Sequence, residues 1–363
     1  MDENTRGNQE KLMTSSHDCV ATALEGCDDT TEIAIFTHRY PDPDAISSMM
    51  ALKWLIGKIS PVKIVNLMYD GGISHPQNQV MDNLLEPNMI KVDELGSSLD
   101  RYSKFFLVDT VPSNAGTGKN AITFDLVIDH HKEPIEQQTP LYYNIHAGSC
   151  AATIYQLIKH HKLEFDEDSE IDKRIATAIL VGIATDTEVL CSQETTTIDV
   201  QTWSELLTKR DPTVLTRIIK YGRPKLWVET KASIIPKVQI NDGLAIVGIG
   251  MFDSKHRDLI SDIADDIKSW EGVHTAIVFA LLDGDTIAGS VRSANSGISV
   301  PSLCKTLGSS KKGQGGGKPG KGAYTYPLGG SSVEDDEEEE IAKATWDLFH
   351  TKELQRVQKT IKG

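Results

Sequence analysis

Short apolar runs alternate with amphipathic segments through the first half of the chain. Nearly continuous apolar runs are typical of strands buried on both faces of a parallel sheet. When such strands alternate with helices, the connections are right-handed crossovers, and the pattern predicts an α/β domain built on a doubly wound parallel sheet. The expected strands lie at residues 33–36, 62–68, 105–108, 126–128 and 141–144, and the expected helices at about 45–58, 77–85, 149–161, and from near 171 onward.

The pattern changes at YGRPKLW, residues 221–227, where glycine and proline interrupt the helical periodicity. We place a domain boundary there and expect domains of residues 1–222 and 223–363. The hairpin signal DGD separates the last two expected strands, so the second half is predicted to be a smaller mixed α/β domain with a partly antiparallel sheet. Its expected strands are residues 232–240, 243–251, 274–282 and 286–293, with a helix at about 255–270.

The charge of the chain limits the partners that it can bind. With 37 basic and 52 acidic residues, the net charge of −15 argues against a long nucleic-acid duplex as a partner, whereas a short oligonucleotide or a nucleotide remains compatible. No apolar run reaches the length of about 20 residues that spans a bilayer, and the first residues are polar, so we expect a cytoplasmic protein without a membrane partner. Five scattered cysteines favour reduced thiols. A homodimer is one option that the sequence leaves open.

Acidic and histidine side chains follow several of the apolar runs. Because parallel strands deliver the residues at their carboxyl ends to one edge of the sheet, we expect these side chains to converge. The last candidate, Asp186, follows the apolar run at residues 178–185, and we group it with the strand ends. A helix that begins near residue 171 would contain this run. The candidates are His38, Asp42 and Asp44; Asp109; Asp129, His130 and His131; and Asp186.

Several carboxylates gathered at one place would repel one another, and burying them without compensation is costly, so they require a cation. Mixed imidazole and carboxylate ligands suit Mn²⁺, Fe²⁺, Co²⁺ or Zn²⁺, and the number of oxygen donors favours Mn²⁺. About six ligands are too many for one ion. Two ions that share a carboxylate can activate water and hold a phosphoryl oxygen, so the set predicts phosphoester hydrolysis.

The motifs that carry these residues resemble those of the DHH phosphoesterases. The resemblance is strongest to the shorter branch with a DHHA1 C-terminal domain, the nanoRNase and pAp-phosphatase-like proteins. It implies a DHH catalytic domain followed by a DHHA1 substrate-binding domain, with the active site in the cleft between them. The matching motifs are HRYPDPDA (38–45), FLVDT (106–110), VIDHH (127–131), GIATDT (182–187), GSVRS (289–293) and GQGGGKPGKGAYTYPLG (313–329).

The same resemblance implies a role for each candidate. Asp109 would bridge two Mn²⁺ ions, with Mg²⁺ or Co²⁺ as alternatives, His131 would face the scissile phosphate, and Asp129 would orient an imidazole. Residues expected on one ion are His38, Asp42 and Asp109; those on the other are Asp44, Asp109, His130 and Asp186. Residues expected to bind substrate are Arg292 and Ser293, and Gly316, Gly317 and Lys318 in the glycine-rich motif. Lys318 departs from the family, which has a histidine there.

The leading hypothesis is a phosphoesterase that hydrolyses short oligonucleotides, linear dinucleotides or the nucleoside bisphosphate pAp to mononucleotides. One alternative is a manganese-dependent inorganic pyrophosphatase or polyphosphatase, which would share the metal cluster. A second is a nonenzymatic nucleotide sensor. The glycine-rich residues 309–332 allow two interpretations, a flexible linker or a nest of backbone amides that binds an anion.

Overall fold

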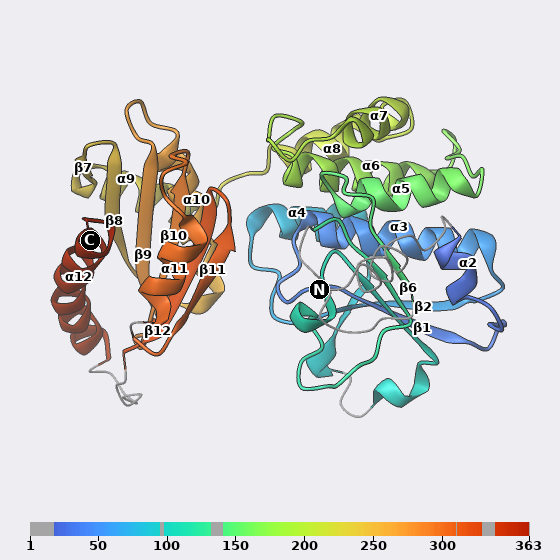
Figure 1. Ribbon diagram of the computed structural model, residues 1–363, viewed down its shortest axis with the longest axis horizontal. Helices are drawn as coiled ribbons and strands as arrows, with labels where there is room; N and C mark the ends of the chain where they lie inside the picture. Colours follow the sequence, from blue (N-terminus) through green and yellow to red (C-terminus); the bar gives the residue numbers. More distant parts are fainter. Residues whose placement is uncertain (1–17, 95–97, 132–140, 310, 329–337, 363) are drawn as a thin grey trace, which may run out of the picture. The chain divides into compact units, whose positions relative to one another are not determined.

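The structure is a computed structural model that describes residues 18–94, 98–131, 141–309, 311–328 and 338–362. It divides into two compact units, Met1–Tyr221 and Gly222–Gly363 (Figure 1). The division falls in the segment where the sequence changes character. The assignment of a catalytic role to one unit and a substrate-binding role to the other stays a prediction.

The first unit is built on a six-stranded sheet in the order β3-β2-β1-β4-β5-β6, and every adjacent pair is parallel. The predicted parallel α/β sheet is therefore confirmed. Along β1, Ile33 and Ile35 face one core and Ala34 and Phe36 face another, as expected for a strand buried on both faces. The strands are β1 (Glu32–Phe36), β2 (Ile64–Tyr69), β3 (Met89–Lys91), β4 (Lys104–Val108), β5 (Leu126–Ile128) and β6 (Leu141–Tyr143).

Helices α3 (Pro43–Ile59), α5 (Cys150–His160) and α6 (Glu170–Asp186) contribute to the larger of these cores. Each begins at a residue whose side-chain oxygen accepts a hydrogen bond from a free backbone N–H of the first turn: Asp42, Ser149 and Ser169. The other core is covered mainly by the segments around the short 3₁₀ turns Val92–Glu94 and Ser98–Arg101. The remaining helices of this unit are α2 (Cys19–Ala23), α4 (Pro76–Leu85), α7 (Thr197–Leu206) and α8 (Pro212–Ile219).

The second unit also contains a six-stranded sheet, in the order β11-β12-β10-β9-β8-β7. Only β8 and β9 pair in parallel, so the predicted mixed sheet is confirmed. Helices α9 and α10 cover one face and α11 and α12 the other. The elements are α9 (Lys225–Ile234), β7 (Gln239–Asn241), β8 (Leu244–Phe252), α10 (Asp258–Lys268), β9 (Thr275–Leu282), β10 (Thr286–Ser293), α11 (Val300–Ser309), β11 (Gln314–Lys318), β12 (Lys321–Pro327) and α12 (Glu338–Lys362).

The strand predicted at residues 232–240 is wrong for most of its length. Residues 225–234 form α9, a 3₁₀ turn follows at Ile235–Lys237, and only Gln239–Asn241 pairs as a strand. Trp227, Thr230 and Ile234 are the buried residues of α9, and their spacing of three and four is that of a helix face. The first three residues of the run that suggested a strand, 232–234, are the end of this helix.

The flexible-linker interpretation of the glycine-rich segment is wrong for the residues that the structure describes there. Residues 314–318 and 321–327 form the antiparallel pair β11 and β12, joined by a two-residue turn in which Gly320 has φ +82°. Helix α11 packs against β11 so closely that a Cβ on Gly315 would lie 1.9 Å from the carbonyl oxygen of Cys304. Close packing therefore accounts for this glycine. Residues 310 and 329–332 lie outside the described residues.

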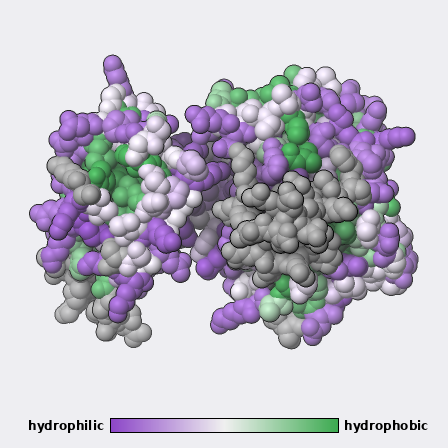
Figure 2. Space-filling model, viewed as in Figure 1, coloured by the Kyte–Doolittle hydropathy of each residue, from purple (hydrophilic) through white to green (hydrophobic). Residues whose placement is uncertain are grey.

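Figure 2 shows hydrophilic residues over much of the visible face of each unit, as expected for a chain with 25% charged residues. Among the described helices, none combines the length and the apolar character needed to cross a membrane.

Candidate metal centre

Three of the four predicted clusters lie at the carboxyl ends of adjacent strands. His38 follows β1, Asp109 follows β4, and residues 129–131 follow β5. Asp186 is instead the last residue of helix α6, so its grouping with the strand ends is wrong, and the helix expected from near residue 171 is the correct element. Asp42 caps α3 and Asp44 lies in its first turn.

Asp109 lies between the two histidines of the centre. Its Oδ2 is 3.6 Å from Nε2 of His38, and its Oδ1 is 3.3 Å from Nε2 of His130. Nε2 of His130 is also 3.3 Å from Oδ2 of Asp186 and 4.0 Å from Oδ2 of Asp44. The two oxygens of one carboxylate thus face two different imidazoles, which is the arrangement that a bridging ligand requires.

The potential ligand atoms fall into overlapping groups in which all atoms lie within 4.8 Å of one another. One of the three groups contains an imidazole from the β1 end, and the other two contain imidazoles from the β5 end. Nε2 of His38 is also 3.8 Å from Oδ2 of Asp42, which completes the first group. The groups are His38, Asp42 and Asp109; Asp44, His130 and Asp186; and Asp109, His130 and His131.

The electrostatics of these residues fit a bound cation. Asp44 is fully buried and Asp109 is 2% exposed. Burial and the neighbouring carboxylates of Asp109 and Asp186 raise the pKa of Asp44 well above its usual range. Although burial opposes it, the close imidazoles hold the pKa of Asp109 well below its usual range. Among the described residues, Oδ1 of Asp109 and Nε2 of His130 are buried without a hydrogen-bond partner, as metal-ligating atoms would be.

Backbone groups that the sequence did not identify hold Asp44 in place. The N–H groups of Cys150 and Ala151 donate to its two oxygens at 2.6 and 3.0 Å. These residues begin α5, where backbone N–H groups have no partner within the helix and attract a negative charge. A Cβ on Gly182 would lie 2.6 Å from Oδ1 of Asp44, so α6 approaches the carboxylate at a glycine. In the sequence, the signal for these free N–H groups was the helix that is predicted to begin at residue 149.

Asp129 orients His131. Oδ1 of the buried Asp129 accepts a hydrogen bond from Nδ1 of His131 at 2.7 Å and from the backbone N–H of His130 at 2.8 Å. The side chain of His131 is 38% exposed, compared with 9% for His130. The two neighbouring imidazoles therefore differ, since one is held by a carboxylate and partly open to solvent while the other lies among the candidate ligands.

The predicted substrate residues lie together at one end of the sheet in the second unit. Arg292 is paired in register with Lys321, and Lys321 with Lys318, so the three side chains project from the same face of adjacent strands. Nε of Arg292 donates to Oδ1 of Asp265 at 2.8 Å, and the hydroxyls of Ser293 and Thr275 are 2.8 Å apart. Gly316 and Gly317 lie in β11 beside Lys318.

Comparison with known proteins supports the resemblance to the DHH phosphoesterases. Residues 32–183 match the DHH family, N-terminal domain. They include every candidate ligand except Asp186. The first part of the chain is therefore similar to a DHH family N-terminal domain, and the chain has homologues in the DHH phosphoesterase superfamily.

Three curated relatives differ in how much of the chain they match. An uncharacterised protein of Methanocaldococcus jannaschii is 28% identical over 82% of this chain and 58% of its own length. A probable manganese-dependent inorganic pyrophosphatase of Oceanobacillus iheyensis is 32% identical over 47% of this chain and 53% of its own length. Cyclic-di-AMP phosphodiesterase PdeA of Listeria monocytogenes is 26% identical over 76% of this chain and 43% of its own length. The chain thus spans about half the length of the curated relatives it matches.

One solved structure shares the fold over nearly the whole chain. It is the crystal structure of an exopolyphosphatase-related protein from Bacteroides fragilis, which is 16% identical with a TM-score of 0.66 and covers 94% of this chain and 98% of its own. At this identity the likeness concerns the fold alone, and it is consistent with a chain of two α/β domains.

Proposed function

We propose that the chain is a phosphoesterase that hydrolyses short oligonucleotides, linear dinucleotides or pAp to mononucleotides with a water activated by two Mn²⁺ ions. The observation that carries this proposal is the position of Asp109, whose two oxygens lie 3.6 and 3.3 Å from two different histidines. His38, Asp42 and Asp109 would hold one ion, and Asp44, Asp109, His130 and Asp186 the other. When bound there, two divalent ions supply a nucleophilic hydroxide and neutralise charge on the phosphoryl oxygens.

His131 would act on the phosphate. Burial lowers the pKa of its imidazole, but the hydrogen bond to Asp129 more than compensates, and the pKa is raised above its usual value. The hydrogen bond to Asp129 engages Nδ1–H of His131, which leaves Nε2 to face an anionic oxygen of the substrate. Asp129 thereby fixes both the orientation and the proton of the catalytic imidazole.

The extent of the matches favours a nucleotide substrate. The match to the cyclic-di-AMP phosphodiesterase covers 76% of the chain, so it includes part of the second unit, whereas the match to the pyrophosphatase covers 47%. The resemblance to the nanoRNase and pAp-phosphatase branch rests on the GSVRS and glycine-rich motifs of the second unit. A pyrophosphatase or polyphosphatase remains the second candidate, because its relative has the higher identity, 32%. The intact set of metal donors disfavours a nonenzymatic sensor.

The proposal is tested by assaying the purified chain with Mn²⁺ on pAp, linear and cyclic dinucleotides, RNAs of several short lengths and pyrophosphate. We expect mononucleotide release from one or more of the short nucleotide substrates and little phosphate release from pyrophosphate. Preference for pyrophosphate would support the second candidate. Hydrolysis of none of the panel would support the sensor.

The cationic side chains at the end of the second sheet give a separate prediction for substrate affinity. Arg292→Ala or Lys318→Ala is expected to weaken substrate binding about ten- to a hundredfold, because a charge-assisted contact to phosphate contributes roughly 1.5 to 3 kcal/mol. Neither change should alter Mn²⁺ stoichiometry. kcat/KM on the two best substrates of the panel is the measurement, and Lys318→His tests whether the family's residue changes the preference between them.

Lys255→Ala is the matched control, since Lys255 lies in the same unit with a side chain that is 66% exposed and pairs with Asp253. It should retain wild-type kcat/KM. If Lys318→Ala also matches the wild type on both substrates, β11 does not contact the substrate and the assignment of Gly316, Gly317 and Lys318 is wrong.

A further inference from the structure

The loop between β6 and α5, residues 144–149, supports two candidate ligands of the same ion. The carbonyl oxygen of Ala147 accepts a hydrogen bond from Nδ1 of His130 at 3.4 Å. A proton held on Nδ1 leaves Nε2 of this imidazole to bind a cation. The loop also sets where α5 begins, and the first N–H groups of α5 donate to Asp44. The position of this loop therefore affects both His130 and Asp44.

The backbone of the loop has a conformation that requires support. His146 has a φ of +55°, in the left-handed region that residues other than glycine rarely adopt. Its N–H donates to Oδ1 of Asn144 at 2.7 Å, and Nδ2 of Asn144 donates to the carbonyl oxygen of His131 at 2.8 Å. Such conformations persist where the surrounding contacts hold them. The contacts that anchor the loop therefore also position its carbonyl groups.

Asp199, in the first turn of α7, anchors the end of the loop. Its buried carboxylate accepts a hydrogen bond from the N–H of Gly148 at 2.8 Å and another from the hydroxyl of Ser149 at 3.1 Å. A Cβ on Gly148 would lie 2.6 Å from Oδ2 of Asp199, so this close approach requires a glycine. The carboxylate thus holds the two residues that immediately precede the N–H groups bound to Asp44.

A local role in capping α7 accounts for only part of these contacts. Oδ2 of Asp199 also accepts hydrogen bonds from the N–H and the hydroxyl of Thr196 at 2.9 and 2.6 Å, and these two residues form the capping box of α7. Gly148 and Ser149 precede Asp199 by 51 and 50 positions in the chain. A capping box does not need these two contacts, which connect α7 to the loop beside the metal centre.

We propose that Asp199 is a positioning residue for the metal centre. It fixes the loop so that the carbonyl group of Ala147 and the first N–H groups of α5 hold His130 and Asp44 in the geometry that binds one ion. The inference rests on the two-ion centre of the proposed function. Asp199 lies outside residues 32–183, which match the DHH family.

The effect of Asp199 should differ between the two ions. Asp44 and His130 belong to one ion, and both depend on the loop. His38 follows β1 and Asp42 caps α3, so the ligands of the other ion are placed by different elements. Loss of the anchor should therefore weaken one ion more than the other.

The test is calorimetric titration of the full chain with Mn²⁺ in the absence of substrate. In Asp199→Ala we expect one of the two equivalents to bind about tenfold more weakly, as when groups that orient metal ligands are removed. The other equivalent should bind nearly as in the wild type. Asp199→Asn keeps an oxygen that can accept from the N–H of Gly148, and it should restore most of the affinity.

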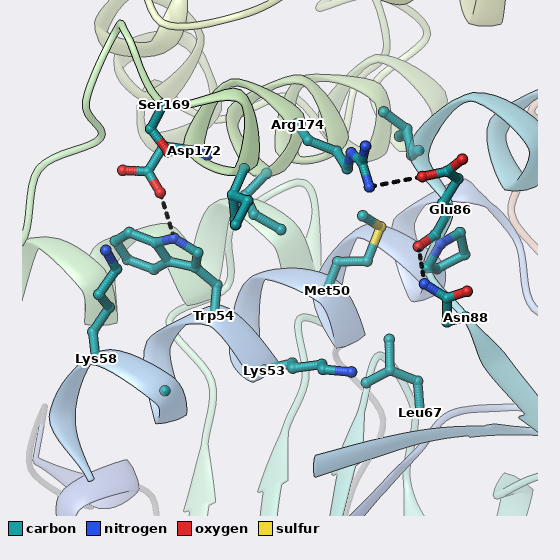
Figure 3. A pocket seen from close by; sticks show the side chains of 15 residues that line it. Met50, Lys53, Trp54, Lys58, Leu67, Glu86, Asn88, Ser169, Asp172 and Arg174 are labelled. Atoms are coloured by element: carbon teal, nitrogen blue, oxygen red, sulfur yellow. Dashed lines mark hydrogen bonds and ion pairs between the residues drawn. The ribbon is translucent and has the colours of Figure 1, made fainter. Parts of the chain in front are cut away.

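Asp172→Ala is the matched control, because Asp172 is also a buried carboxylate in the first turn of a helix, α6. It accepts hydrogen bonds from Nε1 of Trp54 at 2.8 Å (Figure 3) and from the N–H of Asp166 at 3.0 Å. It is separated from Asp186 by about 21 Å along the helix axis. Asp172→Ala and Asp199→Ala should both unfold at a lower temperature than the wild type, but Asp172→Ala should bind both equivalents normally.

Ser149→Ala decides the question if Asp199→Ala does not fold. It removes the hydroxyl that donates to Asp199, and it should weaken the same equivalent to a smaller extent. The proposal is overturned if the folded variant binds both equivalents as tightly as the wild type, if it weakens both equally, or if Asp172→Ala has the same effect. A wild-type chain that binds two ions and hydrolyses none of the substrate panel would contradict the proposed function and leave this inference intact.

Discussion

Asp109→Asn is expected to abolish binding of both Mn²⁺ ions and to reduce turnover by about 10³-fold or more, because one carboxylate serves both halves of the centre. Asparagine tests the role of the charge more specifically than alanine does. It matches the shape of aspartate and tolerates the φ of +59° at this position, where alanine would be strained. The variant therefore removes the charge and leaves the backbone in place. Asp109→Ala should give the same loss of metal with some additional destabilisation.

Mn²⁺ stoichiometry by calorimetry and kcat on the best substrate are the two measurements. Asp29→Asn is the control, since the carboxylate of Asp29 is 58% exposed and pairs only with Lys63 among the described residues. It should bind two equivalents and turn over normally. An Asp109→Asn protein that also binds two equivalents and hydrolyses at the wild-type rate would remove Asp109 from the bridge.

His130→Ala and His131→Ala are expected to have different effects although the residues are neighbours. His130→Ala removes an imidazole whose Nε2 is 3.3 Å from both Asp109 and Asp186, so at least one Mn²⁺ equivalent should be lost together with activity. His131→Ala should keep both ions and lower kcat by about 10²-fold, as for the loss of a group that transfers or donates a proton.

The two variants are compared by Mn²⁺ titration and by steady-state kinetics on the same substrate. His160→Ala, at the exposed end of α5, is the matched control and should leave both quantities unchanged. If His131→Ala loses metal and His130→Ala retains it, the two assignments are reversed. If both retain two ions, neither imidazole is a ligand.

Local sequence was informative where one physical constraint dominated. The apolar runs at β1, β4 and β5 identified parallel strands because both faces of these strands are buried. The carboxyl ends of adjacent parallel strands share one edge of the sheet, which explains why His38, Asp109 and His130 could be grouped before the fold was known.

Where a short apolar run fits both a strand and a helix, its sequence alone did not decide between them. Residues 178–185 belong to α6 and residues 232–234 end α9, and both had been grouped with strands or strand ends. Contacts between segments that are distant in the sequence could not be predicted either. The packing of α11 on Gly315 and the hydrogen bonds from α5 to Asp44 depend on how helices are placed in three dimensions.

The most direct test of the two-ion centre is anomalous diffraction from crystals of the chain grown or soaked with Mn²⁺. We expect two manganese peaks at the carboxyl ends of β1, β4 and β5, with one oxygen of Asp109 bound to each ion. A single peak at saturating Mn²⁺, or two peaks of which only one contacts Asp109, would contradict it.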